Sequence, residues 1–290
     1  MNILVTGANG QLGNEIRELT SEYSGWKFFF SDLPGLDIAN APGVEQYIDK
    51  DDIDIIINCA AYTSVDKAES DIELAFKVNA TGPEVLAKVA SKKKCQLYHI
   101  STDFVFDGKK STPYVEEDKC NSPSVYGKTK QDGEVAVLEN CKTAAIVRTS
   151  WLYSSFGNNF VKTMLRLGKE KEQLGVVYDQ VGTPTYAADL ATAVLKLIDY
   201  NLNNKPEFGI FHYSNEGVAS WYDFTKAIHE IAGVACNVQP ILAEQYPLPA
   251  PRPAFSVLDK NKIKKVLNIT IPYWKDSLLK CIEKINNDNK

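Results

Sequence analysis

A tyrosine and a lysine four residues apart are the side chains whose types and spacing first indicate chemistry in this sequence. They are Tyr126 and Lys130, in the segment YGKTK. Residues four apart on a helix share a face, so the Lys130 ammonium can approach the Tyr126 hydroxyl. A neighbouring cation favours the phenolate and lowers the pKa of a tyrosine towards neutrality. Tyr126 could then donate a proton to a carbonyl oxygen while hydride reaches the carbon, and Lys130 could also hold a nicotinamide ribose.

This spacing alone occurs often by chance, but a second polar cluster strengthens it. Ser101, Thr102 and Asp103 follow a predicted strand over 96–100. Functional sites assemble at the carboxyl ends of strands in a parallel sheet. A hydroxyl there can donate a hydrogen bond to a carbonyl oxygen and stabilise the charge that develops on it. Capping of the strand end is the structural alternative. We predict a catalytic role for at least one hydroxyl, with Thr102 preferred.

Three glycines near the N-terminus form a GxxGxxG pattern. Gly7, Gly10 and Gly13 lie between a predicted strand over 3–5 and a predicted helix over 12–20. Glycines permit a tight turn and let backbone N–H groups approach a pyrophosphate, whose charge a helix N-terminus favours. A plain strand–helix turn would not need three glycines at this spacing. The pattern therefore predicts a dinucleotide site.

Acids after the second predicted strand fit the adenosine end of such a site. Asp32 follows a strand over 28–30, where a carboxylate would bond the ribose hydroxyls. An acid at this position would repel a 2′-phosphate, so Asp32 favours NADH. Asp37, in the following loop, could serve the adenine end.

Small residues after the third predicted strand, over 53–59, would let a cofactor ribose approach the backbone. They are Ala60 and Ala61. The next two residues, Tyr62 and Thr63, fit cofactor contact and simple packing equally well.

Strand and helix signals alternate along the chain. Strands are predicted over 3–5, 28–30, 53–59, 96–100, 144–148 and 208–213, and helices over 12–20, 43–50, 69–78, 83–91, 128–140, 159–169, 187–200 and 221–232. This alternation predicts an α/β fold, a Rossmann-type doubly wound parallel sheet with helices on both faces. We assign residues 1–150, and also about 176–215, to this dinucleotide-binding domain. Residues 151–290 would mainly form a smaller, interleaved C-terminal domain that binds the substrate.

Composition argues against several classes of function. The 290 residues carry a net charge of −5, which gives no bulk attraction for nucleic acid or anionic membranes. No apolar run approaches the ~20 residues that span a bilayer, and the N-terminal MNILVTGANG has the pattern of a strand rather than a signal peptide. Six cysteines without CxxC spacing and three histidines argue against a zinc site. We expect a cytoplasmic protein with reduced thiols.

Several longer segments resemble one family closely. They are GANGQLG, INCAAYTSVDKAE, STDFVFDG, SPSVYGKTKQDGE, RTSWLYSSFGNNFVKTML, DQVGTPTYAADLA and PAPRP, spread from Met1 to about Asp259. This pattern resembles the dTDP-4-dehydrorhamnose reductases, which are extended short-chain dehydrogenases. The resemblance implies a Rossmann domain with a small sugar-nucleotide domain. It also implies reduction of the 4-keto group of dTDP-4-dehydro-β-L-rhamnose to dTDP-L-rhamnose by NADPH or NADH, a step towards polysaccharides.

The resemblance further implies roles for individual residues. The catalytic set would be Thr102, Tyr126 and Lys130. Cofactor contacts would come from Gly10, Gln11, Leu12, Asp37, Ile38, Ala61, Tyr62 and Thr63. Sugar contacts would come from Thr102, Asp103, Tyr126 and Trp151, the last as an apolar wall for the 6-methyl group. Diphosphate or nucleoside contacts are expected from Asn158, Asn159 and Arg252.

The resemblance says less about metal binding and about the oligomeric state than about the reaction. Some members of the family are described as metal-bridged dimers held by carboxylates. Glu15 lies in a suitable helix, but the sequence offers no convincing full set of partner acids. We predict no essential metal and leave both a monomer and a homodimer open.

Two other functions fit the same fold. A sugar-nucleotide epimerase or dehydratase would recycle a tightly held NAD rather than consume free NADH. A reductase-like regulatory subunit would bind another enzyme. Such a subunit would not need the catalytic set described above, and we therefore favour the reductase.

Overall fold

The main sheet has six parallel strands in the order β2-β1-β3-β4-β5-β10. The computed structural model describes residues 1–288. The strands are β1 (Asn2–Thr6), β2 (Lys27–Ser31), β3 (Ile55–Asn58), β4 (Gln96–Thr102), β5 (Ala144–Thr149) and β10 (Gly209–His212). Strands β3 and β5 are buried along their whole length, as expected for central strands covered on both faces. The predicted Rossmann-type α/β fold is confirmed.

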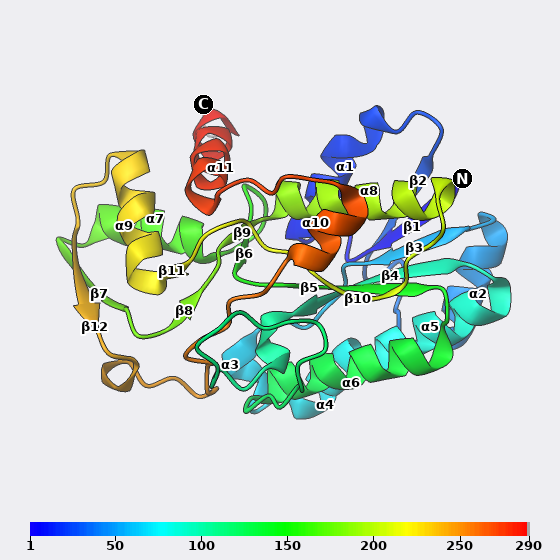
Figure 1. The fold of residues 1–290 in the computed structure, drawn as a ribbon, viewed down its shortest axis with the longest axis horizontal. Helices are drawn as coiled ribbons and strands as arrows, with labels where there is room; N and C mark the ends of the chain where they lie inside the picture. The colour runs from blue at the N-terminus through cyan, green and yellow to red at the C-terminus, as the bar shows by residue number, and fades with distance from the viewer. Residues whose placement is uncertain (289–290) are drawn as a thin grey trace.

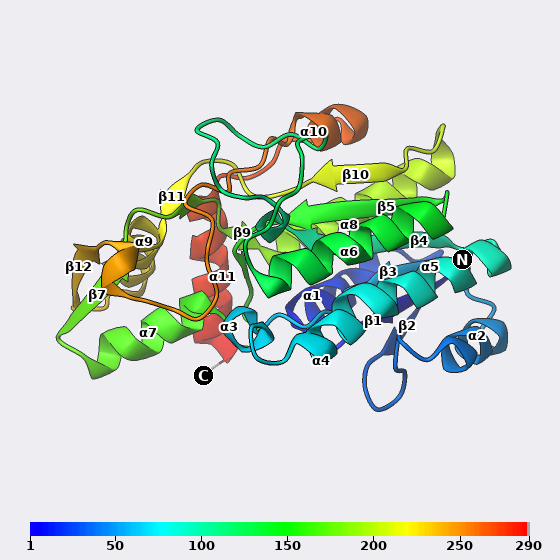
Figure 2. The same ribbon diagram turned by 90° about the horizontal axis from the view of Figure 1, so that it is seen from below.

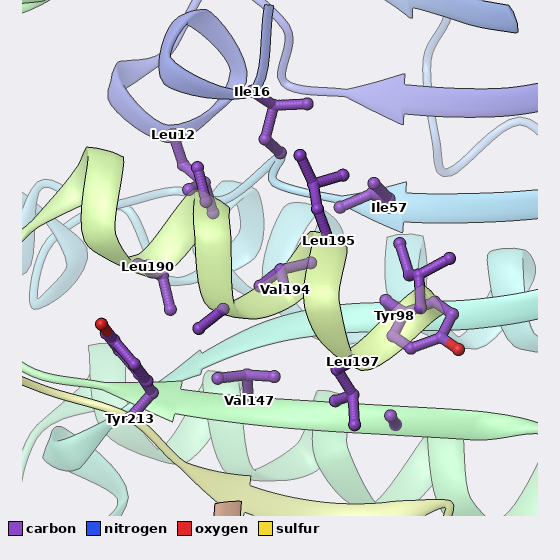
Figure 3. Close-up of a cluster of buried hydrophobic side chains, with 14 of the residues drawn as sticks. Leu12, Ile16, Ile57, Tyr98, Val147, Leu190, Val194, Leu195, Leu197 and Tyr213 are labelled. Atoms are coloured by element: carbon purple, nitrogen blue, oxygen red, sulfur yellow. The ribbon is translucent and has the colours of Figure 1, made fainter. Parts of the chain in front are cut away.

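Helices cover both faces of this sheet (Figure 1). One face carries α1 (Gln11–Leu19), α8 (Ala187–Asn203) and α10 (Asn261–Leu267). The other carries α2 (Ala41–Lys50), α5 (Gly82–Lys93) and α6 (Val125–Asn140). Figure 3 shows the core on the first face, where Leu195 of α8 packs between Ile16 of α1 and Ile57 of β3. Burial of these apolar faces fixes the helices, and hence the strand ends, in place.

A smaller lobe lies beyond the carboxyl ends of the strands (Figure 2). Its helices are α7 (Phe160–Glu170), α9 (Trp221–Ala232) and α11 (Trp274–Asp288). Its strand pairs are β7 (Gln173–Val177) with β12 (Asn237–Ile241), β8 (Val181–Gly182) with β11 (Ala219–Ser220), and β6 (Leu152–Tyr153) with β9 (Thr185–Tyr186). A separate aromatic core holds the lobe together, including Tyr153, Phe224 and Trp274. The chain returns to the main sheet with α8, while β7 stays in the smaller lobe.

Short helical segments complete the connections. They are η1 (Thr20–Glu22), α3 (Val65–Ala68), α4 (Ile72–Phe76), the π-helical η2 (Lys77–Thr81), η3 (Asp103–Val105) and η4 (Ala243–Gln245). The predicted helix over 69–78 is wrong as a single element, because α4 ends at Phe76 and η2 leads directly into α5. The wider turn lets the Asn79 amide point inward, where it accepts from Tyr62 N at 2.8 Å and donates to Tyr62 O at 3.0 Å.

In the described part of the chain, no helix combines the length and apolar character needed to cross a membrane.

Candidate active site

Ligand pockets in proteins commonly enclose about 300–1,000 Å³, and the cleft between the lobes encloses about 660 Å³. It opens at the carboxyl ends of the sheet strands. The predicted site residues that line it are Gly7, Gly10, Gln11, Leu12, Ala61, Thr63, Thr102, Asp103, Tyr126, Lys130, Trp151, Asn158, Asn159 and Arg252. The predicted residues outside its lining are Gly13, Asp32, Asp37, Ile38, Ala60 and Tyr62. Residues from both lobes therefore meet at one edge of the sheet.

The glycine turn places backbone N–H groups along this cleft. Gly7 has φ +62°, and a Cβ there would lie 2.5 Å from Ala60 N. A Cβ on Gly13 would lie 2.6 Å from Ala8 O, where α1 packs against the turn. Gly10 precedes α1, and within residues 1–288 no side chain caps that helix end. Unsatisfied N–H groups at a helix N-terminus are suited to an anion such as a pyrophosphate.

The two acids predicted at the adenosine end have backbone partners. Asp32 accepts from Asn9 N at 3.1 Å and from Leu33 N at 2.9 Å, so its carboxylate lies beside the glycine turn. Asp37 forms an ion pair with Lys77 at 2.8 Å, and its hydrogen bonds with Lys77 and Ala39 N lower its pKa. The sequence pattern did not indicate Lys77, because it lies 40 positions away in the chain.

Thr102 and Tyr126 meet at the centre of the cleft. Thr102 ends β4, accepts from Phe104 N at 3.2 Å and donates to Asp103 Oδ1 at 3.1 Å. Tyr126 lies in the first turn of α6, which begins three residues before the predicted start because Ser124 caps it. Burial raises the pKa of Tyr126 to about 12, and a hydrogen bond with the Thr102 side chain opposes this rise.

The prediction that the Lys130 ammonium lowers the pKa of Tyr126 is wrong for this structure. The Lys130 ammonium donates to Ile100 O at 2.7 Å, in the backbone of β4, and the predicted lowering of the tyrosine pKa is not seen. The four-residue spacing does place both side chains in the cleft. However, the lysine side chain reaches the backbone of β4 rather than the tyrosine hydroxyl. Burial there lowers the pKa of Lys130 to about 8, against the attraction of the Glu134 carboxylate.

Two buried hydroxyls in the cleft wall have no hydrogen-bond partner among the described residues. They are Ser101 Oγ and Thr149 Oγ1, beside the buried Asp103 carboxyl. The last residue of β5, Thr149, pairs in register with Thr102 of β4. Burial raises the pKa of Asp103 to about 7. Buried polar groups normally have partners, so this cluster is suited to a polar ligand.

Trp151 forms part of an aromatic pair that the sequence analysis missed. Its ring stacks on Trp221 at 3.5 Å between centroids, with 6° between the planes, and both rings line the cleft. Trp151 has φ +46°, and a Cβ on Gly182 would lie 2.7 Å from its indole. Trp221 opens α9, 70 positions after Trp151, and no local pattern connects the two.

Two of the three residues predicted to contact a diphosphate or nucleoside, Asn159 and Arg252, are held by other groups, and Asn158 lines the cleft. Asn159 caps α7 by accepting from Lys162 N at 3.1 Å, and it donates to Gln11 Oε1 at 3.0 Å. This bond joins the smaller lobe to the glycine turn. Arg252 binds both carboxylate oxygens of Asp66, at 2.9 and 2.7 Å. Its charge is thus already balanced, which the sequence did not indicate.

Glu15, considered above as a metal ligand, is buried between the lobes. Its carboxylate accepts from Ser154 Oγ at 2.6 Å and from Lys284 Nζ at 3.4 Å, and burial raises its pKa. Residues 1–288 contain no group of three or more His, Cys, Asp or Glu side chains placed to hold a metal ion. The absence of an essential metal remains a prediction.

Comparison with known proteins points to one family. The family described as RmlD substrate binding domain matches residues 1–287. A dTDP-4-dehydrorhamnose reductase of Aggregatibacter actinomycetemcomitans is 41% identical over 283 residues, which cover 95% of this chain and 96% of that protein.

Solved structures agree with this match. The crystal structure of a dTDP-4-dehydrorhamnose reductase from Clostridium acetobutylicum aligns with a TM-score of 0.93 at 43% identity, covering 99% of this chain and 100% of that one. The reductase from Bacillus anthracis, in complex with NADP, aligns with a TM-score of 0.92 at 40% identity, covering 98% and 99%. Both alignments extend over the two lobes.

Proposed function

Because this chain belongs to the dTDP-4-dehydrorhamnose reductase family, we propose that its cleft reduces the 4-keto group of dTDP-4-dehydro-β-L-rhamnose through Thr102, Tyr126 and Lys130. The observation that carries this proposal is the meeting of these three side chains with Trp151 in one cleft. Membership of a reductase family also argues against the epimerase, dehydratase and regulatory-subunit alternatives.

The glycine turn and its surroundings are suited to a nicotinamide dinucleotide. Its pyrophosphate would lie over Gly7, Gly10 and Gly13 at the N-terminus of α1, and its adenosine would lie towards Asp32 and Asp37. The relative from Bacillus anthracis binds NADP, and we propose NADPH or NADH for this chain. When bound, the nicotinamide supplies the hydride.

The protein's own groups would supply the proton. With a pKa of about 12, Tyr126 holds its proton at neutral pH and can act as a general acid towards the oxygen at C4. Thr102 would donate a second hydrogen bond to that oxygen and stabilise its developing charge. Lys130 would hold the nicotinamide ribose and return a proton to the phenolate of Tyr126.

The smaller lobe would hold the sugar nucleotide. The Trp151 ring would form an apolar wall for the 6-methyl group, and Asp103 would accept from a sugar hydroxyl. Asn158, Asn159 and Arg252 would lie along the diphosphate and nucleoside. We propose that the chain acts as a monomer or a homodimer, which light scattering of the purified protein distinguishes.

The test is an assay of reduced-nicotinamide absorbance with dTDP-4-dehydrorhamnose and either cofactor. We expect absorbance to fall only when substrate is present, with dTDP-L-rhamnose as product, and the faster cofactor settles the preference. Tyr126→Phe should lose at least ~10²-fold in kcat while still binding cofactor, because the acid is removed. Tyr178→Phe, at an exposed tyrosine outside the cleft, is the control. Wild-type turnover by Tyr126→Phe would exclude the proposed acid.

A further inference from the structure

A line of buried hydrogen bonds crosses the main sheet and ends at Lys130. Thr6, Asn58 and His99 are register partners on the neighbouring strands β1, β3 and β4. Thr6 Oγ1 donates to Asn58 Oδ1 at 2.7 Å, Asn58 Nδ2 lies 3.0 Å from His99 Nδ1, and His99 Nε2 lies 3.5 Å from Lys130 Nζ. All four side chains are buried. Figure 2 shows α6 lying along the β4–β5 side of the sheet, next to α5.

The bonds around Asn58 determine which nitrogen of His99 carries a proton. Ala60 N lies 3.2 Å from Asn58 Oδ1, and a backbone N–H can only donate, so this atom of the amide is its oxygen. The amide nitrogen therefore faces His99 and donates to Nδ1. A ring nitrogen that accepts a hydrogen bond carries no proton. Since burial keeps the pKa of His99 well below its usual value, the ring is neutral and its one proton lies on Nε2.

The proton on Nε2 points at Lys130. An ammonium can only donate, so it finds no acceptor in this N–H, whereas a neutral amine offers a lone pair that can accept it. The other bond of Lys130 Nζ, to Ile100 O, is available to either form. We propose that Asn58 and His99 are positioning residues. Asn58 holds His99 in the Nε2–H tautomer, and this N–H makes Lys130 release its proton more readily.

The other groups around Lys130 do not cancel this effect. Glu134, one turn further along α6, attracts the ammonium, but both of its oxygens are bound to Arg148, at 2.8 and 2.7 Å. The Cys59 thiol follows β3, and burial raises its pKa to about 12, so it is uncharged at neutral pH. The Tyr126 hydroxyl on α6 is also neutral. Burial of Lys130 acts in the same direction as the tautomer.

This inference rests on the proposed role of Lys130 in the reduction. When Tyr126 gives its proton to the substrate oxygen, its phenolate needs another. The Lys130 ammonium would transfer a proton to the phenolate and become an amine, and the amine would then be reprotonated by the solvent, which supplies the one proton that the reduction consumes. An ammonium that releases its proton readily makes this return fast.

The tautomer can be read directly from nitrogen NMR of protein labelled with ¹⁵N-histidine. The chain has three histidines, so signals are assigned with His212→Gln and His229→Gln. We expect His99 to remain neutral with its proton on Nε2 across pH 5–9 in the wild-type protein. A proton on Nδ1, or a charged ring at pH 6, would overturn the proposal. This measurement needs no substrate, so its outcome is independent of the proposed reaction.

Asn58→Asp tests the link to Lys130. A carboxylate can only accept, so it should move the His99 proton to Nδ1 and leave a lone pair on Nε2 for the ammonium. We expect the alkaline limb of kcat/KM to move up by about one pH unit. Thr6→Val, which leaves Asn58 and its Ala60 bond in place, should move neither the tautomer nor the limb. An unchanged or lowered limb in Asn58→Asp would overturn the proposal.

A double-mutant cycle separates two effects on the alkaline limb of kcat/KM: that of the His99 tautomer and that of the negative charge that Asn58→Asp adds. In a His99→Phe background, Asn58→Asp still places a carboxylate near Lys130 but has no imidazole to reorient. We expect Asn58→Asp to shift the alkaline limb of kcat/KM much less in the His99→Phe background than in the wild-type protein. An equal shift in both backgrounds would assign the effect to charge alone and refute the role of His99. Thermal melts of each variant establish that the protein is folded.

Discussion

At the scale of single residues, the hydroxyl of Thr102 should matter mainly in the transition state. Its Oγ1 is held at the end of β4 by the hydrogen bond from Phe104 N, and its single proton, donated to Asp103 Oδ1 in the free cleft, would turn to the substrate oxygen. We expect Thr102→Val to lower kcat by ~10²-fold with little change in KM, and Thr102→Ser to keep most of the activity. Steady-state kinetics with saturating cofactor measure both. A loss confined to KM would mean that Thr102 only binds the ground state.

The buried carboxyl of Asp103 should make stability depend on pH. Its pKa is about 7 in the folded chain, above the usual 3.8 of the unfolded chain. Between these values the unfolded state binds fewer protons, so the free energy of unfolding falls as pH rises. Asp103→Asn should therefore be more stable than the wild type at pH 8, by up to about 4 kcal/mol, and equal to it near pH 4.

Urea denaturation at both pH values measures this difference. Asp107→Asn is a suitable control, because Asp107 is partly exposed and its pKa is lowered rather than raised. The same or a larger gain at pH 4 would show that the aspartate carboxyl is not the cause.

Single-residue patterns predicted which side chains meet in the cleft but not how their protons are held. The spacing of Tyr126 and Lys130 follows from helix geometry, which is local. The bond of Lys130 to Ile100 O and the burial that sets both pKa values depend on β4 lying beneath α6. That arrangement arises from packing between segments about 30 positions apart, which periodicity does not report.

At the scale of elements, α9 contributes Trp221 to the wall of the cleft. Stacking on Trp151 fixes the plane of the ring that would face the sugar. We expect Trp221→Ala to raise the KM for the sugar nucleotide roughly two- to tenfold, the range an aromatic pair supports, with a smaller effect on kcat. Trp221→Phe should recover most of the affinity. The near-ultraviolet circular dichroism of the stacked indoles should disappear in both variants.

Trp26→Phe is the matched control, because Trp26 stacks on Tyr23 away from the cleft. It should leave KM unchanged. If Trp221→Ala loses the dichroism but keeps the wild-type KM, the stack does not position Trp151 for the substrate.

The strands of the main sheet and its long helices were predictable because β-branched runs and helical periodicity belong to short segments. The short strand pairs of the smaller lobe were missed, and so were backbone details that a side-chain hydrogen bond sets. Helix α6 begins at Val125 because the Ser124 hydroxyl accepts from Gly127 N, and the predicted start at 128 missed this cap. The π-helical turn around Asn79 depends on its bonds to Tyr62, 17 positions earlier.

At the scale of the whole molecule, the interleaved lobes were predictable only in outline. Helix α8 and strand β10 return to the main sheet, and helices α10 and α11 were not anticipated. The junction of the lobes joins residues far apart in the chain, such as Glu15 and Lys284, which are separated by 269 positions. Such pairs leave no trace in a local pattern.

The bond between Ser154 and Glu15 should stabilise this junction. Ser154 Oγ donates to the buried Glu15 carboxylate at 2.6 Å, and its removal would leave the carboxylate with the longer contact to Lys284. We expect Ser154→Ala to lower the free energy of unfolding by about 1–3 kcal/mol, the cost of a buried acceptor without its donor. Ser155→Ala is the control, because its buried Oγ has no partner among the described residues, and it should change stability by less than ~0.5 kcal/mol. Equal losses in the two variants would assign the effect to packing rather than to the hydrogen bond.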